Sequence, residues 1–267
     1  MTEFTVIIPA RHGSTRLPGK PLRLIAGRPM VEHVYRRAVA SGAARVLVAT
    51  DDRRIVEACQ AFGAESLLTD PAHATGTDRI AEVVCREGLA DEAIVVNLQG
   101  DEPLMPPALL YQVAQALDRR SDVAMATLAT AIHDPAELAS PHVVKVVVTA
   151  DRRALYFSRA PIPWDRDGAD GGRLPPPVGA GIYRRHLGIY AYRAAFLRRY
   201  QGLPECELAQ REQLEQLKVL WHGEAILVED AWEPSGPGVD TEADLLLVER
   251  RLSIVNESIL LAGKGLE

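Results

Sequence analysis

The sequence predicts an α/β protein with a mixed, mostly parallel sheet flanked by helices. Over roughly the first 100 residues, strand segments alternate with helical segments, which is the pattern of a sheet built from β-α-β units. These strand segments are apolar throughout, so both faces of the sheet are expected to be covered. Beyond them paired strands replace the alternation, which indicates antiparallel additions to the sheet. The first three predicted strands span residues 4–8, 46–50 and 65–68.

Composition narrows the functional class. The chain has 267 residues, of which 47% are hydrophobic and 5% aromatic, with a net charge of −6. A chain of this length and apolar content can form a sizeable core. An acidic chain with few aromatic residues is a poor candidate for binding nucleic acid. Three cysteines lack metal or disulfide spacing, and no signal peptide or membrane-length apolar run is visible. We expect a cytoplasmic protein with no membrane or nucleic-acid partner.

The first strand leads into a cationic loop, residues 9–22, which reads PARHGSTRLPGKPL. Glycine lets backbone N–H groups approach an anion, and the side chains supply charge, so the loop suits a triphosphate. Its glycine spacing matches neither the dinucleotide-binding loop nor the Walker A loop. A solvated basic loop is the alternative. Between Phe4 and Val31 there is no Asp or Glu, and the cations are Arg11, Arg16, Lys20, Arg23 and Arg28.

The segments that follow continue the α/β alternation. Helices are predicted at 29–41 and 53–62, and glycines 42 and 63 suit their ends. The loop 69–77 has no periodicity and precedes a helix at 80–85, for which Thr77 or Asp78 is a plausible N-cap.

A fourth strand, residues 93–98, ends in the sequence QGDEP. Ligands bind at the carboxyl ends of strands in open α/β sheets, so Asp101 is placed at the same edge as the cationic loop. An acid beside a triphosphate loop is unfavourable unless a divalent cation lies between them, and Mg²⁺ takes one or two carboxylates plus phosphate oxygens. Asp101 is therefore a candidate metal ligand. The alternative is that it caps the helix predicted at 107–117.

The second half of the chain is expected to be richer in paired strands. A strand at 123–131 precedes a hairpin formed by 142–149 and 154–158. The Gly- and Pro-rich stretch 166–185 reads as a mobile loop or a lid. In the next strand, 186–192, alternation places polar residues on one face, which suits either a polyhydroxy ligand or a plain sheet or dimer surface. That face carries His186, Gly188, Tyr190 and Tyr192.

The C-terminal part is predicted to hold three helices and a last strand. The helices span 194–201, 207–220 and 242–259, and the strand spans 225–229. On residue types alone, Glu215 and Gln216 fall on a solvated helix face. Asp240 is either the second carboxylate of the Mg²⁺ site or, with Thr241, a helix N-cap.

Six motifs occur in order: RxxSxRLPGKPL, QGDEP, SRAxIPWDR, HLGIYxYR, LEQLKVLW and PGxGVDT. With them the chain closely resembles the 3-deoxy-manno-octulosonate (Kdo) cytidylyltransferases from Phe4 to about Leu252. The resemblance implies a glycosyltransferase-A-like nucleotidyltransferase fold, a homodimer, and Mg²⁺-dependent synthesis of CMP-Kdo and pyrophosphate from CTP and Kdo for lipopolysaccharide assembly. It implies one domain, with 1–130 and 222–267 mainly nucleotide-binding and a smaller β-rich part, 131–221, serving sugar-acid binding and dimerisation.

The resemblance also assigns roles to residues. It implies that Asp101 and Asp240 hold Mg²⁺ and act in catalysis together with Arg11 and Lys20. The nucleotide site it implies consists of Pro9, Ala10, Arg11, Ser14, Lys20 and Gln99. The sugar-acid site it implies consists of Arg79, Gln99, Arg159, His186, Tyr190, Glu215 and Gln216.

The implied reaction is in-line attack of the anomeric 2-hydroxyl of Kdo on the α-phosphorus of CTP, driven by positioning and charge neutralisation. Arg159 is expected to pair with the Kdo carboxylate. One departure from the family pattern, Cys206-Glu207-Leu208-Ala209 in place of Ser-x-Leu-Glu, affects the start of the 207–220 helix. Three alternatives stay open: an 8-amino-Kdo enzyme, a sialic-acid enzyme, and a catalytically silent nucleotide-binding module.

Overall fold

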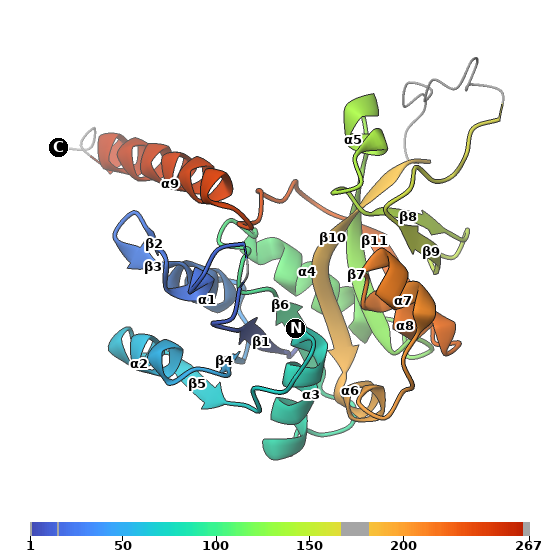
Figure 1. The fold of residues 1–267 in the computed structure, drawn as a ribbon, viewed down its shortest axis with the longest axis horizontal. Helices are drawn as coiled ribbons and strands as arrows, with labels where there is room; N and C mark the ends of the chain where they lie inside the picture. The colour runs from blue at the N-terminus through green and yellow to red at the C-terminus, as the bar shows by residue number, and fades with distance from the viewer. Residues whose placement is uncertain (1, 15, 167–181, 264–267) are drawn as a thin grey trace.

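The computed structural model describes residues 2–14, 16–166 and 182–263, with side chains described as far as residue 253 (Figure 1). Most of the stretch interpreted as a mobile loop or lid, 166–185, lies outside the described residues. Among the helices that the model describes, none is long and apolar enough to cross a membrane.

The main sheet confirms the predicted mixed, mostly parallel architecture. Its order is β11-β7-β10-β6-β1-β4-β5, and β10 runs antiparallel to both of its neighbours, β6 and β7, while the other pairs are parallel. The antiparallel strand therefore sits inside the sheet (Figure 1). The strands are β1 Thr5–Ala10, β4 Arg45–Thr50, β5 Glu65–Leu68, β6 Ile94–Leu98, β7 Met125–Ala131, β10 Arg184–Arg193 and β11 Ile226–Asp230.

Two small antiparallel pairs complete the strands. β8 (Lys145–Val148) and β9 (Ala154–Ser158) form the predicted hairpin, which joins the main sheet where β8 pairs with β10. β2 (Leu24–Ile25) and β3 (Arg28–Pro29) pair separately after the cationic loop, which itself ends in a 3₁₀ turn, Lys20–Leu22.

Helices cover both faces of the sheet, as its apolar strands require. Buried residues of α1, α2 and α4 form one core with one face, and those of α3, α6 and α8 form a second core with the other. The helices are α1 Met30–Ala40, α2 Arg53–Ala61, α3 Gly76–Arg86, α4 Pro107–Asp118, α5 Pro135–Ala139, α6 Ala194–Tyr200, α7 Glu207–Glu212, α8 Gln216–Trp221 and α9 Glu242–Gly263.

The start of α3 differs from the prediction. The N-cap is Thr75, whose Oγ1 accepts a hydrogen bond from the backbone N–H of Asp78 (3.1 Å), so Thr77 and Asp78 lie inside the first turn. The competing signal was Gly76, which weakens a helix in its interior but is tolerated in this first turn.

The predicted helix 207–220 is wrong as a single element. Gln213 adopts a left-handed conformation (φ 54°) and separates α7 from α8. No Gly or Pro marks the break, so no local signal in the sequence predicts it. At the start of α7, the Cys206 sulfur takes the cap position and accepts from the Ala209 N–H at 3.5 Å.

Gly100 stands where two chain segments approach closely. A Cβ at this position would lie 2.8 Å from the carbonyl oxygen of Pro9, a backbone atom that cannot rotate away. We expect Gly100→Ala to destabilise the protein by about 1–3 kcal/mol, the usual cost of overpacking. The measurement is the urea unfolding midpoint.

Gly13→Ala is the matched control, because a Cβ there meets nothing within 4 Å. Equal midpoints for the two variants would show that the contact between Gly100 and Pro9 does not constrain the fold.

Candidate active site

Two neighbouring cavities lie at the carboxyl ends of β1 and β6. The first has a volume of about 240 Å³ and the second about 300 Å³, and Gln99 and Glu215 line both. The first is lined from the N-terminal half by Pro9, Ala10, Arg11, Ser14, Arg16, Lys20, Pro21, His73, Ala74, Thr75, Gly76, Arg79, Gln99, Gly100 and Asp101, and from the C-terminal half by Glu215 and Asp240.

The Lys20 side chain makes three hydrogen bonds at the first cavity. Its ammonium donates to Asp101 Oδ2 at 2.6 Å, to Asp240 Oδ1 at 3.1 Å and to the Val239 carbonyl at 3.0 Å. The two aspartates, far apart in sequence, therefore bring their carboxylates within reach of one point. A second cation, Arg16, reaches Asp240 at 3.0 Å.

Neither aspartate is engaged as a helix cap. Helix α4 has Pro106 at its N-cap without a side-chain cap bond. At α9, Thr241 Oγ1 accepts from the Asp244 N–H (3.3 Å) and the Asp244 carboxylate accepts from the Thr241 N–H (2.9 Å), which is a capping box. The cap alternative therefore applies to Thr241, and the Asp240 side chain faces the first cavity.

The aspartates have the chemistry of a Mg²⁺ site. Carboxylate oxygens are the ligands this ion prefers, and it commonly takes only one or two of them besides substrate phosphates and water. No cluster of three or more His, Cys, Asp and Glu side chains suited to a metal occurs in the part of the chain that the structure describes. The pair Asp101 and Asp240 thus fits a metal shared with a phosphate ligand.

Glu102 is a third carboxyl group close to this pair. Loss of hydration and the neighbouring Asp101 carboxylate raise the pKa of Glu102 to about 8. It lines the second cavity, next to Gln99. A neutral carboxylic acid here limits the negative charge beside Asp101 and Asp240.

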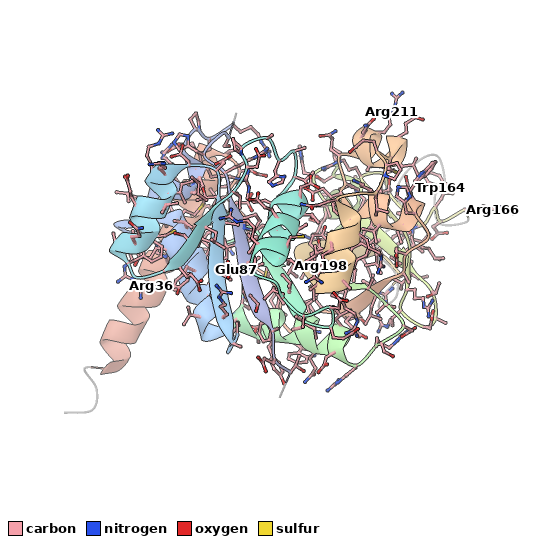
Figure 2. The ribbon with its side chains drawn as sticks, turned by 90° about the horizontal axis from the view of Figure 1, so that it is seen from below. Arg36, Glu87, Trp164, Arg166, Arg198 and Arg211 are labelled. Carbon is pink, nitrogen blue, oxygen red and sulfur yellow. The ribbon has the colours of Figure 1, made fainter. Side chains whose placement is uncertain are left out.

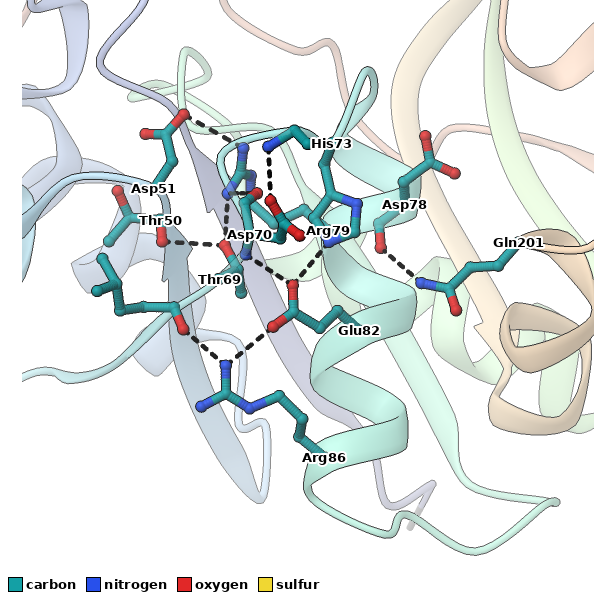
Figure 3. Close-up of polar contacts among 12 residues, drawn as sticks. Thr50, Asp51, Thr69, Asp70, His73, Asp78, Arg79, Glu82, Arg86 and Gln201 are labelled. Atoms are coloured by element: carbon teal, nitrogen blue, oxygen red, sulfur yellow. Dashed lines mark hydrogen bonds and ion pairs between the residues drawn. The ribbon is translucent and has the colours of Figure 1, made fainter.

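The far wall of the first cavity is the loop between β5 and α3, shown in Figure 3. The buried Arg79 guanidinium holds this loop: it donates to the Thr69 hydroxyl and to the Asp51 carboxylate, the latter at 3.3 Å. Burial lowers the pKa of Arg79. Arg79, assigned to the sugar-acid site by resemblance, lines the first cavity and braces its wall.

His73 is anchored in the same wall. Its Nε2 lies 2.6 Å from a Glu82 carboxylate oxygen that also accepts from the Asp70 N–H (Figure 3). Arg86 holds the other oxygen of Glu82 at 2.9 Å. Glu82 and Arg86 of α3 therefore hold this loop in place.

The second cavity contains most of the predicted sugar-acid residues. Its described lining is Gln99, Glu102, His142, Val143, Val144, Arg185, His186, Gly188, Tyr190, Gln213, Leu214, Glu215 and Gln216. Tyr190 donates its hydroxyl to Gln216 Oε1 at 3.2 Å, while the buried Gln216 Nε2 has no partner among the described atoms. The break at Gln213 turns Glu215 and Gln216 toward the cavities, which a continuous helix would not do.

His186 is buried behind this cavity with 8% of its surface exposed. Thr127 Oγ1 donates to the Ile189 carbonyl at 2.7 Å and lies 3.0 Å from His186 Nε2, so the ring proton is assigned to Nε2. The rings of His186 and Tyr190 lie 5.3 Å apart, and Tyr192 follows at 5.9 Å from Tyr190, which confirms their predicted shared face.

Arg159 lies outside the described lining of both cavities. Its guanidinium donates to the backbone carbonyls of Glu212 (2.7 Å) and Pro141 (2.9 Å). Those two residues directly precede cavity-lining residues, so Arg159 stands at the edge of the second cavity.

The structure brings the residues predicted for the nucleotide site, Pro9, Ala10, Arg11, Ser14, Lys20 and Gln99, together at the first cavity. Arg16 is among the cations of the predicted loop, but neither it nor His73, Glu102 or Arg185 is among the predicted site residues, and all four line the cavities. Arg16 and Glu102 belong to the motifs RxxSxRLPGKPL and QGDEP, and that was an available signal. His73 and Arg185 had no signal beyond their residue type.

A cationic loop and paired carboxylates at the open end of a mostly parallel sheet define a nucleotidyltransferase, and the cytidylyltransferase family model matches residues 5–226. Curated relatives named 3-deoxy-manno-octulosonate cytidylyltransferase are 63% identical over 249 residues in Halorhodospira halophila, 54% over 253 in Methylococcus capsulatus and 56% over 249 in Pseudomonas fluorescens. These matches cover 93–94% of this chain and 96–98% of the relatives. The chain belongs to the 3-deoxy-manno-octulosonate cytidylyltransferase family.

A solved structure agrees with this assignment. That structure, CMP:2-keto-3-deoxy-manno-octonic acid synthetase complexed with CTP, superposes with a TM-score of 0.84 at 44% identity. The match covers 95% of this chain and 99% of the other. The family and the nucleotidyltransferase fold implied by the sequence motifs are both confirmed.

The buried His186 predicts a pH-dependent stability. Burial lowers the pKa of His186 to about 3, below the ordinary 6.5 of the unfolded chain. As the pH falls below 6.5, only the unfolded chain gains this proton, so stability is lost by about 1.4 kcal/mol per pH unit from this group. Urea unfolding at pH 7 and pH 5 should show a smaller loss for His186→Gln than for the wild type. Parallel losses would contradict the neutral, buried histidine.

Proposed function

We propose that this chain transfers CMP from CTP to the anomeric hydroxyl of Kdo and releases pyrophosphate, supplying CMP-Kdo for lipopolysaccharide assembly. The observation that supports this most directly is the pair of cavities that meet at Gln99 and Glu215. The first is lined by Arg and Lys side chains together with three carboxyl groups, and the second by amide, hydroxyl and imidazole groups together with one guanidinium and two carboxyl groups. Family membership supplies the identities of the two substrates.

In this proposal the first cavity binds CTP. Arg11, Arg16 and Lys20 neutralise the charge of the phosphates, and Ser14 adds a hydroxyl at the same loop. Pro9 and Ala10 at the end of β1 are placed to contact the nucleoside through backbone groups. A bound Mg²⁺ would be held by Asp101 and Asp240 and would supply charge stabilisation at the phosphates.

The sugar acid occupies the second cavity in this proposal. Tyr190, Gln216 and Glu215 offer hydrogen-bonding groups to the hydroxyls, and Arg159 at the edge offers a guanidinium to the carboxylate. Gln99 lines both cavities, so this proposal has the hydroxyl meet the α-phosphorus beside it. Holding the two reactants at this junction provides the positioning on which phosphoryl transfer depends.

We also propose that the protein acts as a cytoplasmic homodimer. Among the described residues of the 131–221 part, four large apolar side chains are more than half exposed: Leu155 (58%), Trp164 (63%), Ile182 (59%) and Trp221 (57%). Figure 2 shows Trp164 at the outer edge of the molecule, on the side away from α9. Exposed apolar groups of this size suit a contact between copies.

The substrate assignment is tested by pyrophosphate release with Mg²⁺, crossing CTP, UTP, GTP and ATP against Kdo, 8-amino-Kdo and N-acetylneuraminate. We expect release with CTP and Kdo. Release with CTP and another sugar acid would keep the reaction and change the acceptor. CTP binding without release for any pair would identify a silent nucleotide-binding module.

The metal assignment is tested by Asp101→Asn and Asp240→Asn. Each removes one carboxylate from the proposed ion, so kcat/KM should fall by about 100-fold or more at saturating Mg²⁺. Mn²⁺ binding followed by electron paramagnetic resonance in the presence of CTP should weaken in parallel. Asp118→Asn, a change at an exposed aspartate at the end of α4, is the control. Wild-type rates and Mn²⁺ affinity in both variants would exclude this metal site.

A further inference from the structure

A buried lysine lies beside the second cavity and takes no part in the proposed chemistry. Lys145, the first residue of β8, has 0% of its surface exposed. A buried ammonium is strongly unfavourable unless its three N–H donors are all satisfied. The position of this buried lysine beside the second cavity therefore calls for an explanation.

The Lys145 ammonium is fully satisfied by backbone carbonyls alone. It donates to the carbonyl oxygens of Ser140 at 2.8 Å, Val143 at 2.6 Å and Arg159 at 2.5 Å. Ser140 ends the turn after α5, Val143 precedes β8, and Arg159 follows β9. One charge thus fixes the turn that precedes β8 relative to the segment that follows β9.

A second, partly buried contact holds the same segment. The Glu212 carboxylate accepts from the Ser158 hydroxyl at 2.6 Å and from the Arg159 N–H at 2.9 Å. Glu212 is the last residue of α7, and the next residue, Gln213, is the left-handed one that lines the cavity. Hydrogen bonds to a charged acceptor are stronger than neutral ones, so this link is a firm one.

These contacts set the position of Arg159. Its carbonyl is held by Lys145 and its N–H by Glu212, while its guanidinium spans the carbonyls of Pro141 and Glu212. The residues that follow those two, His142 and Gln213, both line the second cavity. Lys145 and Glu212 therefore hold the arginine between two stretches of the cavity lining that are far apart in sequence.

We propose that Lys145 and Glu212 are positioning residues for the sugar acid: they hold Arg159 and the two cavity walls beside it, without touching either substrate. The inference rests on the proposed function, since it concerns the site assigned to Kdo. A displacement of about 1 Å at a substrate-positioning group can cost on the order of 100-fold in rate, so the loss of such a clamp should be visible kinetically. The first cavity should be unaffected, because neither residue contacts its lining loops.

The test compares steady-state constants for both substrates in Lys145→Met, Glu212→Ala and Glu212→Gln. We expect the KM for Kdo to rise about tenfold or more in Lys145→Met and Glu212→Ala, with the KM for CTP within about twofold of wild type. Glu212→Gln keeps one carbonyl acceptor for Ser158 or Arg159, so its rise should be smaller than that of Glu212→Ala. This graded rescue separates positioning from simple loss of a residue.

Two controls accompany these variants. Glu207→Gln changes an exposed acid on the same helix, α7, and should leave both constants unchanged. Val113→Ala removes buried volume from α4, away from the second cavity, and reports the kinetic effect of lower stability alone. Unfolding midpoints of all variants show which are folded at the assay temperature. If Lys145→Met is not folded, Glu212→Gln takes its place in the test.

The outcomes separate the inference from the function it rests on. A folded Glu212 variant with an unchanged KM for Kdo would overturn the inference while the wild type still turned over CTP and Kdo. An equal rise in both KM values, matched by Val113→Ala, would assign these residues to general stability and also overturn it. No turnover by the wild type with any sugar acid would refute the proposed function first, and the inference with it.

Discussion

The contact of Lys20 with Asp101 and Asp240 is the constraint on which the site depends. It joins the loop after β1, the end of β6 and the segment before α9, which are separated by 81 and 220 residues along the chain. The two carboxylates repel each other and would repel a bound triphosphate. The Lys20 ammonium between them offsets this repulsion. A metal bound by both aspartates would compete with Lys20 for the same oxygens. The ammonium would then be free to contact the phosphates of a bound nucleotide, so the same cluster could balance its charges with and without the substrate.

The position of β10 explains how one sheet serves two substrates. This antiparallel strand is inserted between β6 and β7, and its residues His186, Gly188 and Tyr190 line the second cavity beside the end of β6. The strand that lines the second cavity is thus hydrogen-bonded directly to the strand that leads into Gln99 and Asp101. In the proposed function, β-sheet geometry, which is stiffer than a hinge between separate domains, would set the distance between the two substrates.

Much of this arrangement could be read from the sequence because the physics behind it is local. The apolar strands, the glycines at helix ends and the carboxylate after 93–98 can each be interpreted from neighbouring residues alone. The rule that ligands bind at strand ends then places the cationic loop and the carboxylate on one edge of the sheet. The break at Gln213 and the cap at Thr75 could not be read. Gln213 is a non-glycine residue in a left-handed conformation with no Gly or Pro beside it, and Thr75 is followed by a glycine, a residue that weakens helices. The roles of Glu215 and Gln216 depend on that break, which is why residue types alone left them on a solvated face.

Lys145 and Glu212 illustrate a further limit of sequence reasoning. A lysine in a strand of valines and a glutamate near a helix end both look like ordinary solvated charges, and most of their partners are backbone groups. Nothing in the residue types of those partners signals the contact, because every residue has a backbone carbonyl and almost every residue a backbone N–H. A buried charge needs hydrogen-bonding partners to offset the loss of hydration. The Lys145 ammonium finds them in two carbonyls of the turn that precedes β8 and in the carbonyl of Arg159 just after β9, so it joins that turn to the segment that carries Arg159.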